Sequence, residues 1–492
     1  MNRAARTSGH SRWNSRVNGL PVLVLSLAAT LSLAAGSFKP IALHPDNPHY
    51  FLFRGKPTIL ITSAEHYGAV LNLDFDYIPY LNELRARRFN LTRTFAGAYR
   101  EVAGSFKIAN NTLAPVARDR YICPWARSST PGAVDGGSKF DLNKWNDAYF
   151  RRLKDFVAQA GKRGVVVELV LFCTFYEDRL WDLSPMNAKN NTNGVGAVTR
   201  EQVYALKEDA LTAVQDAMVR KIVGELRDFD NVYYEICNEP YFAGVTLDWQ
   251  NHIASTIVSA EASFPSKHLI AQNIANKGAV VANPNPAVSI FNFHYASPPD
   301  TVKQNHGLNK VIAFDESGFR RTADLPYRTE AWAFVLAGGA VYDNLDYSYT
   351  AAHPDGTAKV TEPTPGGGGP SLRSQLKILR DFIGGFDFIH MRPDTSFIRD
   401  LPQGVKAYAL VESGKQYAIC LQDGSQVDLK LDIPVGRYRA EWVNTHTGAI
   451  DKAQTVNHSG GLLSLVSPKY SEDIALRLLR KGRLSWLPKI LR

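Results

Sequence analysis

Apolar runs and amphipathic stretches alternate along the chain from about residue 56 to residue 385. Each unit consists of a short apolar run, a polar loop and a longer segment with helical spacing. This alternation predicts a parallel sheet covered by helices, and eight such units predict an α/β fold of the (β/α)8 TIM-barrel type. The expected strands are residues 58–63, 89–95, 165–172, 232–237, 268–273, 289–293, 311–314 and 340–344.

Helices are expected between these strands, at residues 75–87, 145–162, 202–226, 247–263, 328–336 and 371–383. In the second helix Leu153, Phe156 and Ala160 recur at helical spacing and define one apolar face. Residues 361–370 (TEPTPGGGGP) are rich in glycine and proline, as a linker between domains would be. The barrel still needs its eighth helix, however, so we expect this stretch in the loop after the eighth strand. The barrel domain is then residues 37–392.

From about residue 395 the pattern changes to an alternation of period two, which is typical of strands with one buried face. It runs through residues 405–410, 416–421, 427–431 and 438–443. We therefore expect a small antiparallel β-sandwich domain over residues 393–478. The chain then ends in a basic, leucine-rich tail, residues 479–492. This tail makes either peripheral contact with an anionic membrane or none, and Gly482 and Pro488 favour the second alternative because they interrupt a helix.

The formal net charge of +9 resides at the two ends of the chain. The first 36 residues and the last 16 carry ten basic residues and no acidic one, which leaves 46 basic and 47 acidic residues between them. A nucleic-acid partner requires a basic surface on the folded body, so none is expected.

The N-terminus has the order of a secretory signal peptide. Four arginines precede an apolar run at residues 20–35, and small residues follow it. The run is short for a membrane span. We therefore expect residues 1–36 to be a signal peptide and the protein to be secreted or periplasmic, with an uncleaved membrane anchor as the alternative. Export permits disulfides, and Cys173 and Cys237 fall on neighbouring strands, but we favour small buried apolar residues for all four cysteines.

Two of the apolar strands end in glutamates. The fourth strand ends in Asn238 and Glu239, and Pro240 stops it. The seventh strand, three strands later, ends in Asp315 and Glu316. Because side chains alternate along a strand, we expect only one of Asp315 and Glu316 to face the barrel axis. The carboxyl ends of barrel strands are where barrel enzymes hold their catalytic groups.

Two converging carboxylates are what glycosidic cleavage requires. One carboxylic acid protonates the leaving oxygen, and the other carboxylate attacks the sugar or directs water. Glutamates on strands four and seven of one barrel can converge at about 5 Å, the separation expected for retention of configuration. Glu239 and Glu316 are therefore the candidates for this pair.

With these motifs, residues 40–390 resemble clan A retaining glycoside hydrolases, near the family 5 cellulase-like group. In that clan an Asn-Glu pair ends strand four, with the glutamate as acid/base, and a glutamate nucleophile ends strand seven. The resemblance maps the pair onto Asn238 and Glu239 and the nucleophile onto Glu316. As acid/base, Glu239 must start protonated, so we expect its pKa to be raised by partial burial and by the charge of Glu316. The resemblance also implies that Asn238 binds the 2-hydroxyl group of the sugar. The C-terminal sandwich is similar to a domain sometimes labelled collagen-binding.

Further residues match the clan around the nucleophile. Arg93 matches an arginine on strand two that supports the nucleophile, and its opposite charge would favour the ionised carboxylate. His294 and Tyr295 match the groups that end strand six, and Tyr295 could donate a hydrogen bond to Glu316. The family pattern often has a histidine after strand three and a tryptophan after strand eight, whereas residues 171–176 and 341–347 contain neither.

Several other side chains are candidates for binding or for structure. Glu235 and Glu168 lie within apolar strands and are expected to be buried and ion-paired, Glu235 with Arg93. His66, in the sequence Glu-His-Tyr that ends the first strand, is a candidate sugar contact. Trp181, in the long loop after the third strand, is the expected sugar platform, because aromatic faces stack on sugar rings. The other aromatic residues of the rim loops either stack on sugar or cover the core: Trp125, Tyr176 and Tyr241.

The expected function is a retaining O-glycosyl hydrolase that cleaves a β-linked oligo- or polysaccharide by double displacement. Its expected partner is the carbohydrate, with no cofactor. No metal site is expected, because the sequence lacks HxH and HExxH patterns. Two alternatives use the same features: a non-catalytic envelope protein that binds a glycan or matrix protein, and a transglycosylase that uses the same two glutamates. The first is disfavoured because two unpaired like charges on the rim would repel each other.

Overall fold

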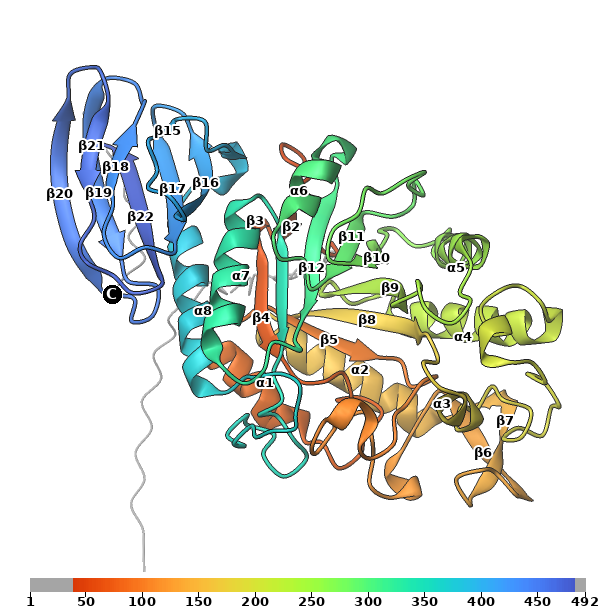
Figure 1. Cartoon of the computed structure of the whole chain (residues 1–492). Helices are drawn as coiled ribbons and strands as arrows, with labels where there is room; N and C mark the ends of the chain where they lie inside the picture. The colour runs from red at the N-terminus through yellow and green to blue at the C-terminus, as the bar shows by residue number, and fades with distance from the viewer. Residues whose placement is uncertain (1–38, 483–492) are drawn as a thin grey trace, which may run out of the picture. The chain divides into compact units, whose positions relative to one another are not determined.

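The computed structural model describes residues 39–482, and eight parallel strands form its central sheet (Figure 1). The strands are β4 (Leu60–Ala64), β5 (Leu91–Phe95), β8 (Val166–Cys173), β9 (Val232–Asn238), β10 (Ile270–Asn276), β11 (Ile290–His294), β12 (Val311–Ser317) and β13 (Val341–Leu345). They pair in the order β4, β13, β12, β11, β10, β9, β8, β5. All eight expected strands are present, and the predicted TIM-barrel fold is confirmed.

The two ends of this sheet meet at β4 and β5, where the side chain of Asn90 joins them. The amide N–H of Ile61 donates to Asn90 Oδ1 at 2.9 Å, and Asn90 Nδ2 donates to the carbonyl of Ile59 at 2.9 Å. The backbone N–H of Asn90 also donates to the carbonyl of Ile61 at 3.4 Å. The side-chain amide of Asn90 thus replaces part of the backbone hydrogen bonding between β4 and β5 and brings the barrel close to closure.

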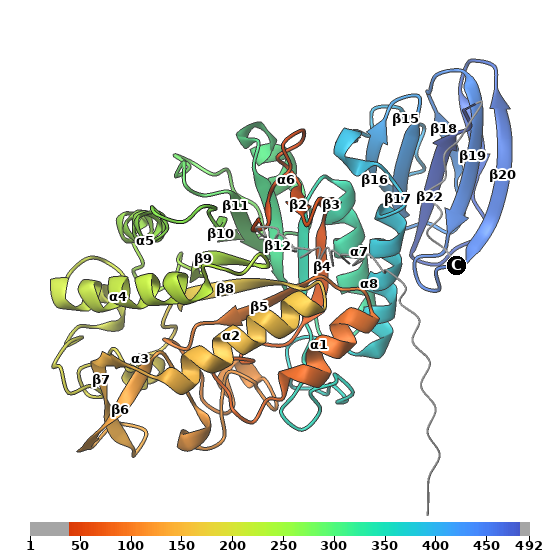
Figure 2. The ribbon, with the colours of Figure 1, turned by 180° about the vertical axis from the view of Figure 1, so that it is seen from behind.

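Helices cover the outside of the strands, as Figure 2 shows from behind. They are α1 (Tyr77–Ala86), α2 (Asp147–Lys162), α4 (Asp209–Leu226), α5 (Leu247–Ala260), α6 (Asp300–Asn305), α7 (Asp324–Leu336) and α8 (Pro370–Ile383). Asn146 caps α2 and Thr246 caps α5, each accepting hydrogen bonds from first-turn N–H groups. α8 begins at Pro370, directly after the glycine-rich stretch, so that stretch lies in the loop after β13 as expected.

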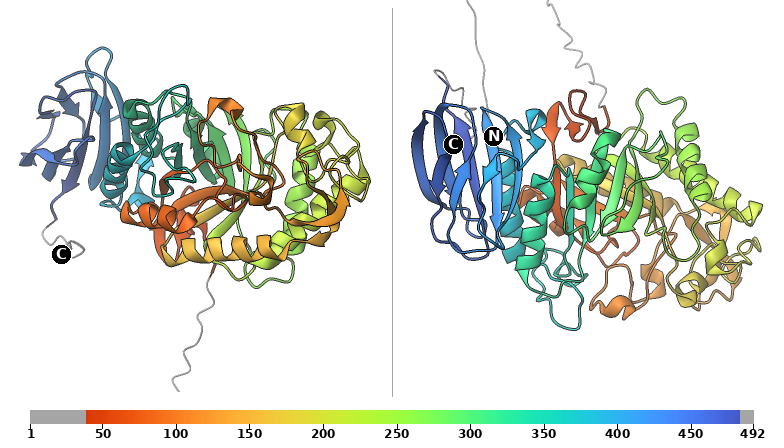
Figure 3. Two further views of the ribbon diagram at one scale, coloured as in Figure 1. Left: turned by 90° about the horizontal axis from the view of Figure 1, so that it is seen from below. Right: turned by 45° about the horizontal axis from the view of Figure 1, so that its top comes forward.

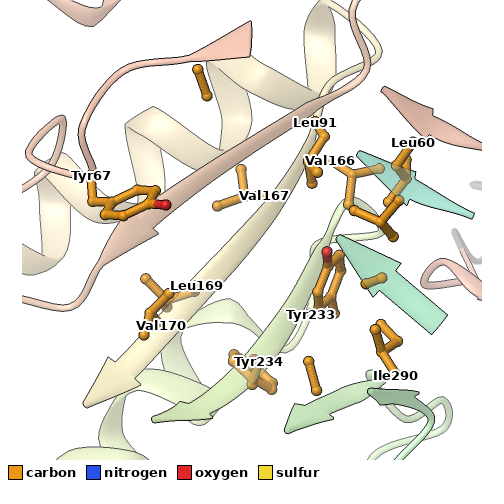
Figure 4. Close-up of a cluster of buried hydrophobic side chains, with 14 of the residues drawn as sticks. Leu60, Tyr67, Leu91, Val166, Val167, Leu169, Val170, Tyr233, Tyr234 and Ile290 are labelled. Carbon is orange, nitrogen blue, oxygen red and sulfur yellow. The ribbon is translucent and has the colours of Figure 1, made fainter. Parts of the chain in front are cut away.

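The buried side chains of the barrel strands change character along each strand. Leu60, Leu91, Val166 and Ile290 stand at the strand starts, and all are fully buried among other apolar side chains (Figure 4). Further along the strands the buried side chains become polar and charged, Arg93 on β5 and Glu168 and Glu235 on β8 and β9 among them. Charge is therefore concentrated toward the carboxyl ends, where barrel enzymes place their chemistry.

Several features were not expected from the hydrophobic pattern. A three-stranded sheet precedes β4 and consists of β1 (Ala42–Leu43), β2 (Phe51–Phe53) and β3 (Lys56–Thr58). A hairpin of β6 (Trp125–Pro131) and β7 (Ser138–Trp145) lies in the loop after β5, and the short helix α3 (Asp178–Asp182) follows β8. Short 3-10 turns occupy Ser105–Lys107, Arg118–Arg120, Arg200–Gln202, His306–Leu308 and Phe388–His390.

After α8 the chain forms two antiparallel sheets (Figure 3). The larger contains β14 (Arg392–Pro393), β16 (Lys406–Glu412), β17 (Gln416–Gln422), β22 (Asp473–Arg480), β19 (Gly436–Val443) and β20 (Ile450–His458). The smaller contains β15 (Ile398–Arg399), β18 (Asp428–Leu431) and β21 (Leu463–Val466). A separate apolar cluster that includes Trp442 and Leu429 joins them. Because β22 pairs with both β17 and β19, residues 479 and 480 belong to the sheet and not to a tail.

The larger sheet packs against α7 of the barrel, and the barrel core continues into it through Leu410, Ala418 and Cys420. Arg328 of α7 is 3% exposed and donates to Asp473 Oδ1 at 2.7 Å. It also donates to Glu472 at 2.6 Å. Barrel and sandwich therefore share a core and a buried ion pair.

The expected signal peptide, residues 1–36, lies outside the described residues, as do residues 483–492 of the basic tail. Within residues 39–482, no helix combines the length and the apolar character needed to cross a membrane. All four cysteines are buried and free, which confirms that they act as small apolar residues and not as disulfide partners.

Candidate active site

The two glutamates singled out from the sequence lie side by side at the carboxyl ends of β9 and β12. One oxygen of Glu239, one oxygen of Glu316 and a ring nitrogen of His294 all lie within 4.8 Å of one another. Glu239 follows β9 directly with a φ of 47°, an uncommon value for a residue other than glycine. Both carboxylates are mostly buried, with 7% and 6% of their residues' surface exposed. A strained backbone next to a buried charge pair is typical of functional sites.

Three side chains hold Glu316. The hydroxyl of Tyr295 donates to Oε1 at 2.5 Å, and the hydroxyl of Tyr67 donates to Oε2 at 2.8 Å. Arg93 Nη1 also donates to Oε2, at 3.3 Å. Because each oxygen accepts a hydrogen bond from a tyrosine, the carboxylate is fixed in orientation and its negative charge is stabilised.

Arg93 is fully buried and organises the groups beneath Glu316. It donates two hydrogen bonds of 2.8 Å to the two oxygens of Glu235, in the bidentate arrangement that suits a guanidinium. It also lies 3.3 Å from Asp315 and donates to Asn238 Oδ1 at 2.7 Å. The expected ion pair between Glu235 and Arg93 is confirmed. Burial raises the pKa of Glu235 to about 7, although Arg93 acts in the opposite direction.

Glu239 is surrounded by a different set of donors. The hydroxyl of Tyr176 donates to Oε2 at 2.5 Å and the hydroxyl of Tyr241 donates to Oε1 at 3.1 Å. His294 Nδ1 lies 3.1 Å from Oε1. Asn238 donates from Nδ2 to the hydroxyl of Tyr176 at 2.9 Å, so the same tyrosine links the two neighbours Asn238 and Glu239.

The prediction of a raised pKa for Glu239 is wrong for the unliganded site. Burial alone would raise the pKa of Glu239, but the hydrogen bond and charge of His294 and the bonds from Tyr176 and Tyr241 outweigh it, and the pKa is lowered. His294 shows the matching effect. Burial acts to lower the pKa of His294, but the carboxylates of Glu316 and Asp315 raise it well above its usual value. Both shifts favour a proton on His294 and a charged Glu239.

The prediction that only one of Asp315 and Glu316 faces the interior is also wrong. Both contact Arg93, Asp315 at 3.3 Å from Nε and Glu316 at 3.3 Å from Nη1. The pairing register of β12 shifts at this point against both β11 and β13. An irregularity of this kind breaks the strict alternation of side chains.

Glu168, the other mid-strand acid singled out from the sequence, forms hydrogen bonds in place of the expected direct ion pair. It accepts from Asn292 at 2.7 Å and from Tyr233 at 2.9 Å. Burial and the charges of Asp315 and Glu235 raise the pKa of Glu168 well above its usual value.

The aromatic platform expected at Trp181 is not in the site. Trp181 is 3% exposed, its ring lies 5.0 Å from that of Phe175, and its indole N–H donates to the carbonyl of Val198 at 2.9 Å. Trp125 is fully buried as well. Both indoles belong to the main apolar core of the barrel, so they pack beneath the loops instead of facing sugar.

The two glutamates open into a pocket, in which the space not filled by protein atoms, open solvent included, is about 360 Å³. His66, Asn238 and Tyr295 line it, as expected of substrate contacts, and Arg93 lies beneath it. The sequence did not single out several other lining residues, since they come from loops without periodicity: Glu101, Phe106, Ile108, Leu113 and Phe319. The segment 101–113, in the loop after β5, supplies four of these five.

Two clusters of described residues are close enough together to suggest metal ligands. One is Glu239, His294 and Glu316, and the other is Glu168, Glu235 and Asp315. Both glutamates of the first cluster already accept hydrogen bonds from tyrosines. In the second cluster, Arg93 already contacts Glu235 and Asp315. We therefore assign no ion to either cluster.

Residues 114–275 match a family of unknown function, DUF6298. No curated protein sequence matches the chain. Its fold is similar to that of a Bacteroides vulgatus protein described as a candidate glycoside hydrolase, with 15% identity, a TM-score of 0.63 and coverage of 90% of this chain and 83% of that one. It is also similar to a glycoside hydrolase of family 5 from Bacteroides vulgatus, with 12% identity, a TM-score of 0.59 and coverage of 90% and 93%.

Proposed function

We propose that the protein is a retaining glycoside hydrolase that cleaves a β-glycosidic bond by double displacement. The separation of the two carboxylates carries this proposal. Oxygens of Glu239 and Glu316 lie within 4.8 Å of each other, close to the roughly 5–5.5 Å of retaining enzymes and well below the 6.5–9.5 Å that leaves room for a direct water. The glycoside hydrolases of similar fold support the same reaction class.

In the first half of the reaction Glu316 attacks the anomeric carbon. The bond from that carbon to the leaving oxygen breaks, and Glu239 transfers a proton to this oxygen. A glycosyl ester on Glu316 results. In the second half a water attacks the same carbon, gives a proton to Glu239 and releases Glu316, so that one water is consumed for each bond cleaved.

The groups around Glu316 keep it ready to attack. Tyr295 and Tyr67 bind one oxygen each, and Arg93 places a positive charge beside it. Asn238, held at 2.7 Å by Arg93, would bind the 2-hydroxyl of the sugar, as the family resemblance implies. These contacts exist before substrate arrives, so they require little reorganisation during the reaction.

Glu239 obtains its proton from the pair that it forms with His294. In the free site this proton is on the imidazole, 3.1 Å from Oε1. A sugar that excludes water from the pocket would penalise a separated charge pair and favour the neutral form of both groups. Transfer of the proton from His294 to Glu239 would then give the protonated acid that the first step requires.

Mutation of each glutamate tests the proposal. Glu316→Ala should abolish turnover of aryl glycosides, and azide should restore it with a glycosyl azide as product. An activated 2-fluoroglycoside should form a covalent adduct on Glu316 of the wild-type protein, detected by mass spectrometry of the peptide. Full activity of Glu316→Ala would exclude the assignment. Sugar binding without adduct or turnover would favour a glycan-binding protein, and transfer to added sugar in preference to water would favour a transglycosylase.

The signal-like pattern of residues 1–36 supports export of this enzyme, so its proposed substrate is an extracellular or periplasmic carbohydrate.

A further inference from the structure

The segment 101–113, which we term the pocket lobe, forms one wall of the pocket. Its two ends join through the N–H of Glu101, which donates to the carbonyl of Leu113 at 2.9 Å. Glu101 also accepts a hydrogen bond from Asn111 within the lobe and one from Tyr99 at 3.2 Å. Side chains from this lobe contribute Glu101, Phe106, Ile108 and Leu113 to the pocket.

The pocket lobe is anchored at its base. Thr112 donates to the buried carboxylate of Glu65 at 2.6 Å and lies 2.7 Å from the carbonyl of His66. Its backbone passes so close to Gly68 that a Cβ atom there would lie 2.2 Å from the carbonyl oxygen of Thr112. The position of Glu101 is therefore fixed by the fold, and only glycine at residue 68 allows this approach.

Glu101 and His66 face each other in the pocket, with Oε2 and Nε2 3.4 Å apart. Only 5% of Glu101 and 9% of His66 is exposed. Neither ring nitrogen of His66 makes a hydrogen bond of good geometry to the described protein. Buried polar groups rarely lack partners, so these nitrogens indicate that another molecule supplies them. Burial acts to lower the pKa of His66, but Glu101, Glu316 and Glu65 raise it, which favours a charged donor.

The charge of the pocket restricts that molecule. Its lining contains three carboxylates, those of Glu101, Glu239 and Glu316, one imidazole, that of His66, and no lysine or arginine. An anionic sugar would face this excess of negative charge, whereas neutral hydroxyl groups can donate to Glu101 and accept from His66.

We propose that Glu101 and His66 bind two adjacent hydroxyl groups of a neutral sugar and that the pocket excludes uronic acids. The inference rests on the proposed glycosidase function of the site and adds a recognition pair to it. Glu101 accepts from one hydroxyl, and His66 donates to its neighbour. Together they select the sugar unit that lies over Glu316.

Equilibrium binding to the full chain tests this pair. Binding of methyl glycosides of glucose, mannose, galactose and xylose, and of methyl glucuronide, is followed by NMR titration of the sugar signals. Glu101→Gln should weaken binding of the preferred neutral sugar by roughly 10- to 150-fold, the range expected for a hydrogen bond to a charged group. Lys107→Gln is the matched control, because it makes the opposite change of charge on an exposed residue of the same lobe and should leave binding unchanged.

Deoxy analogues of the preferred sugar identify the contact. The analogue that lacks the hydroxyl bound by Glu101 should bind wild type and Glu101→Gln equally, since the missing partner removes the interaction in both. If Glu101→Gln weakens every analogue by the same factor, Glu101 has only a structural role and the proposal is overturned. Tighter binding of the glucuronide, or no binding of any neutral sugar, would overturn it too.

If Glu101→Gln does not fold, binding of the deoxy analogues to the wild-type protein still tests the pair. Two adjacent hydroxyls should each be required for binding, and a series in which none matters excludes the pair. Sugar binding through Glu101 without adduct formation on Glu316 would leave the recognition pair standing and the hydrolase proposal refuted. Turnover that does not depend on Glu101 would refute the recognition pair and leave the hydrolase proposal standing.

Discussion

Arg93 donates two hydrogen bonds to Glu235 and a third to Glu316, and no part of its side chain is exposed. The guanidinium therefore joins a carboxylate of the barrel interior to the proposed nucleophile. The guanidinium carbon of Arg93 lies over the ring of Tyr67, 4.6 Å from its centre. One buried cation thus balances the charge of Glu235 and orients Glu316 at the same time.

Replacement of Arg93 should separate these two roles. Arg93→Met would leave Glu235 and Asp315 buried without a cation, and we expect the free energy of unfolding to fall by about 3–5 kcal/mol. The double variant Arg93→Met, Glu235→Leu removes one of these two uncompensated charges and should recover part of this stability but none of the activity. Denaturant unfolding and turnover of an aryl glycoside measure the two effects. A double variant as unstable as the single one would contradict the proposed charge balance.

Tyr295→Phe tests whether the hydroxyl of Tyr295 orients the proposed nucleophile, Glu316. The hydroxyl lies 2.5 Å from Glu316 Oε1, and its loss should lower kcat roughly 10- to 150-fold, the effect of one hydrogen bond to a charged group. Stability should change little, because Tyr295 is partly exposed and the ring remains. Tyr470→Phe, which removes a hydroxyl bound to a backbone carbonyl in the sandwich, is the control and should keep full activity. Equal kcat values for the two variants would contradict the role of Tyr295.

His294 should determine the alkaline side of the pH profile. The raised pKa of His294 means that the proton shared with Glu239 is retained above neutral pH and lost as pH rises through that pKa. In His294→Gln the amide still donates to Glu239 but carries no charge. The alkaline limb of kcat/KM against pH should therefore move to lower pH, by at least about one unit. His252→Gln, at a surface pair with Asp216, should leave the limb in place. A limb that stays in place in His294→Gln would show that the proton comes from elsewhere.

The sequence predicted the barrel well because strands buried on both faces leave continuous apolar runs, such as residues 165–172. It also predicted the two glutamates, since each stands where an apolar run ends. It failed at Asp315, because a register shift in β12 is set by pairing with β11 and β13 and not by local sequence. It failed again at Trp181, because exposure of a loop residue depends on packing that periodicity does not describe.

Glu101 and Tyr176 show the other limit of prediction from sequence. Glu101 lies in the loop after β5, without neighbours that mark it as a binding residue, and a polar residue after a barrel strand is a signal that selects many others. Tyr176 was expected either to stack on sugar or to cover the core. Its hydroxyl instead donates to Glu239 at 2.5 Å, a contact that the aromatic pattern of the loops did not indicate.

The ion pair between Arg328 and Asp473 should make barrel and sandwich unfold together. In Asp473→Asn, the one acidic partner left to Arg328 among the described residues is Glu472, whose side chain is 48% exposed. We therefore expect the free energy of unfolding to fall by about 3 kcal/mol, the low end for a broken buried pair. Because the barrel core continues into the sandwich, hydrogen exchange should accelerate in α7 and β17 alike. Asp432→Asn, which breaks an exposed pair with Arg399, should cost less than about 1 kcal/mol. Faster hydrogen exchange in the sandwich alone would mean that barrel and sandwich unfold independently. In either case the activity of Asp473→Asn at low temperature should be unchanged, because Asp473 does not line the active-site pocket.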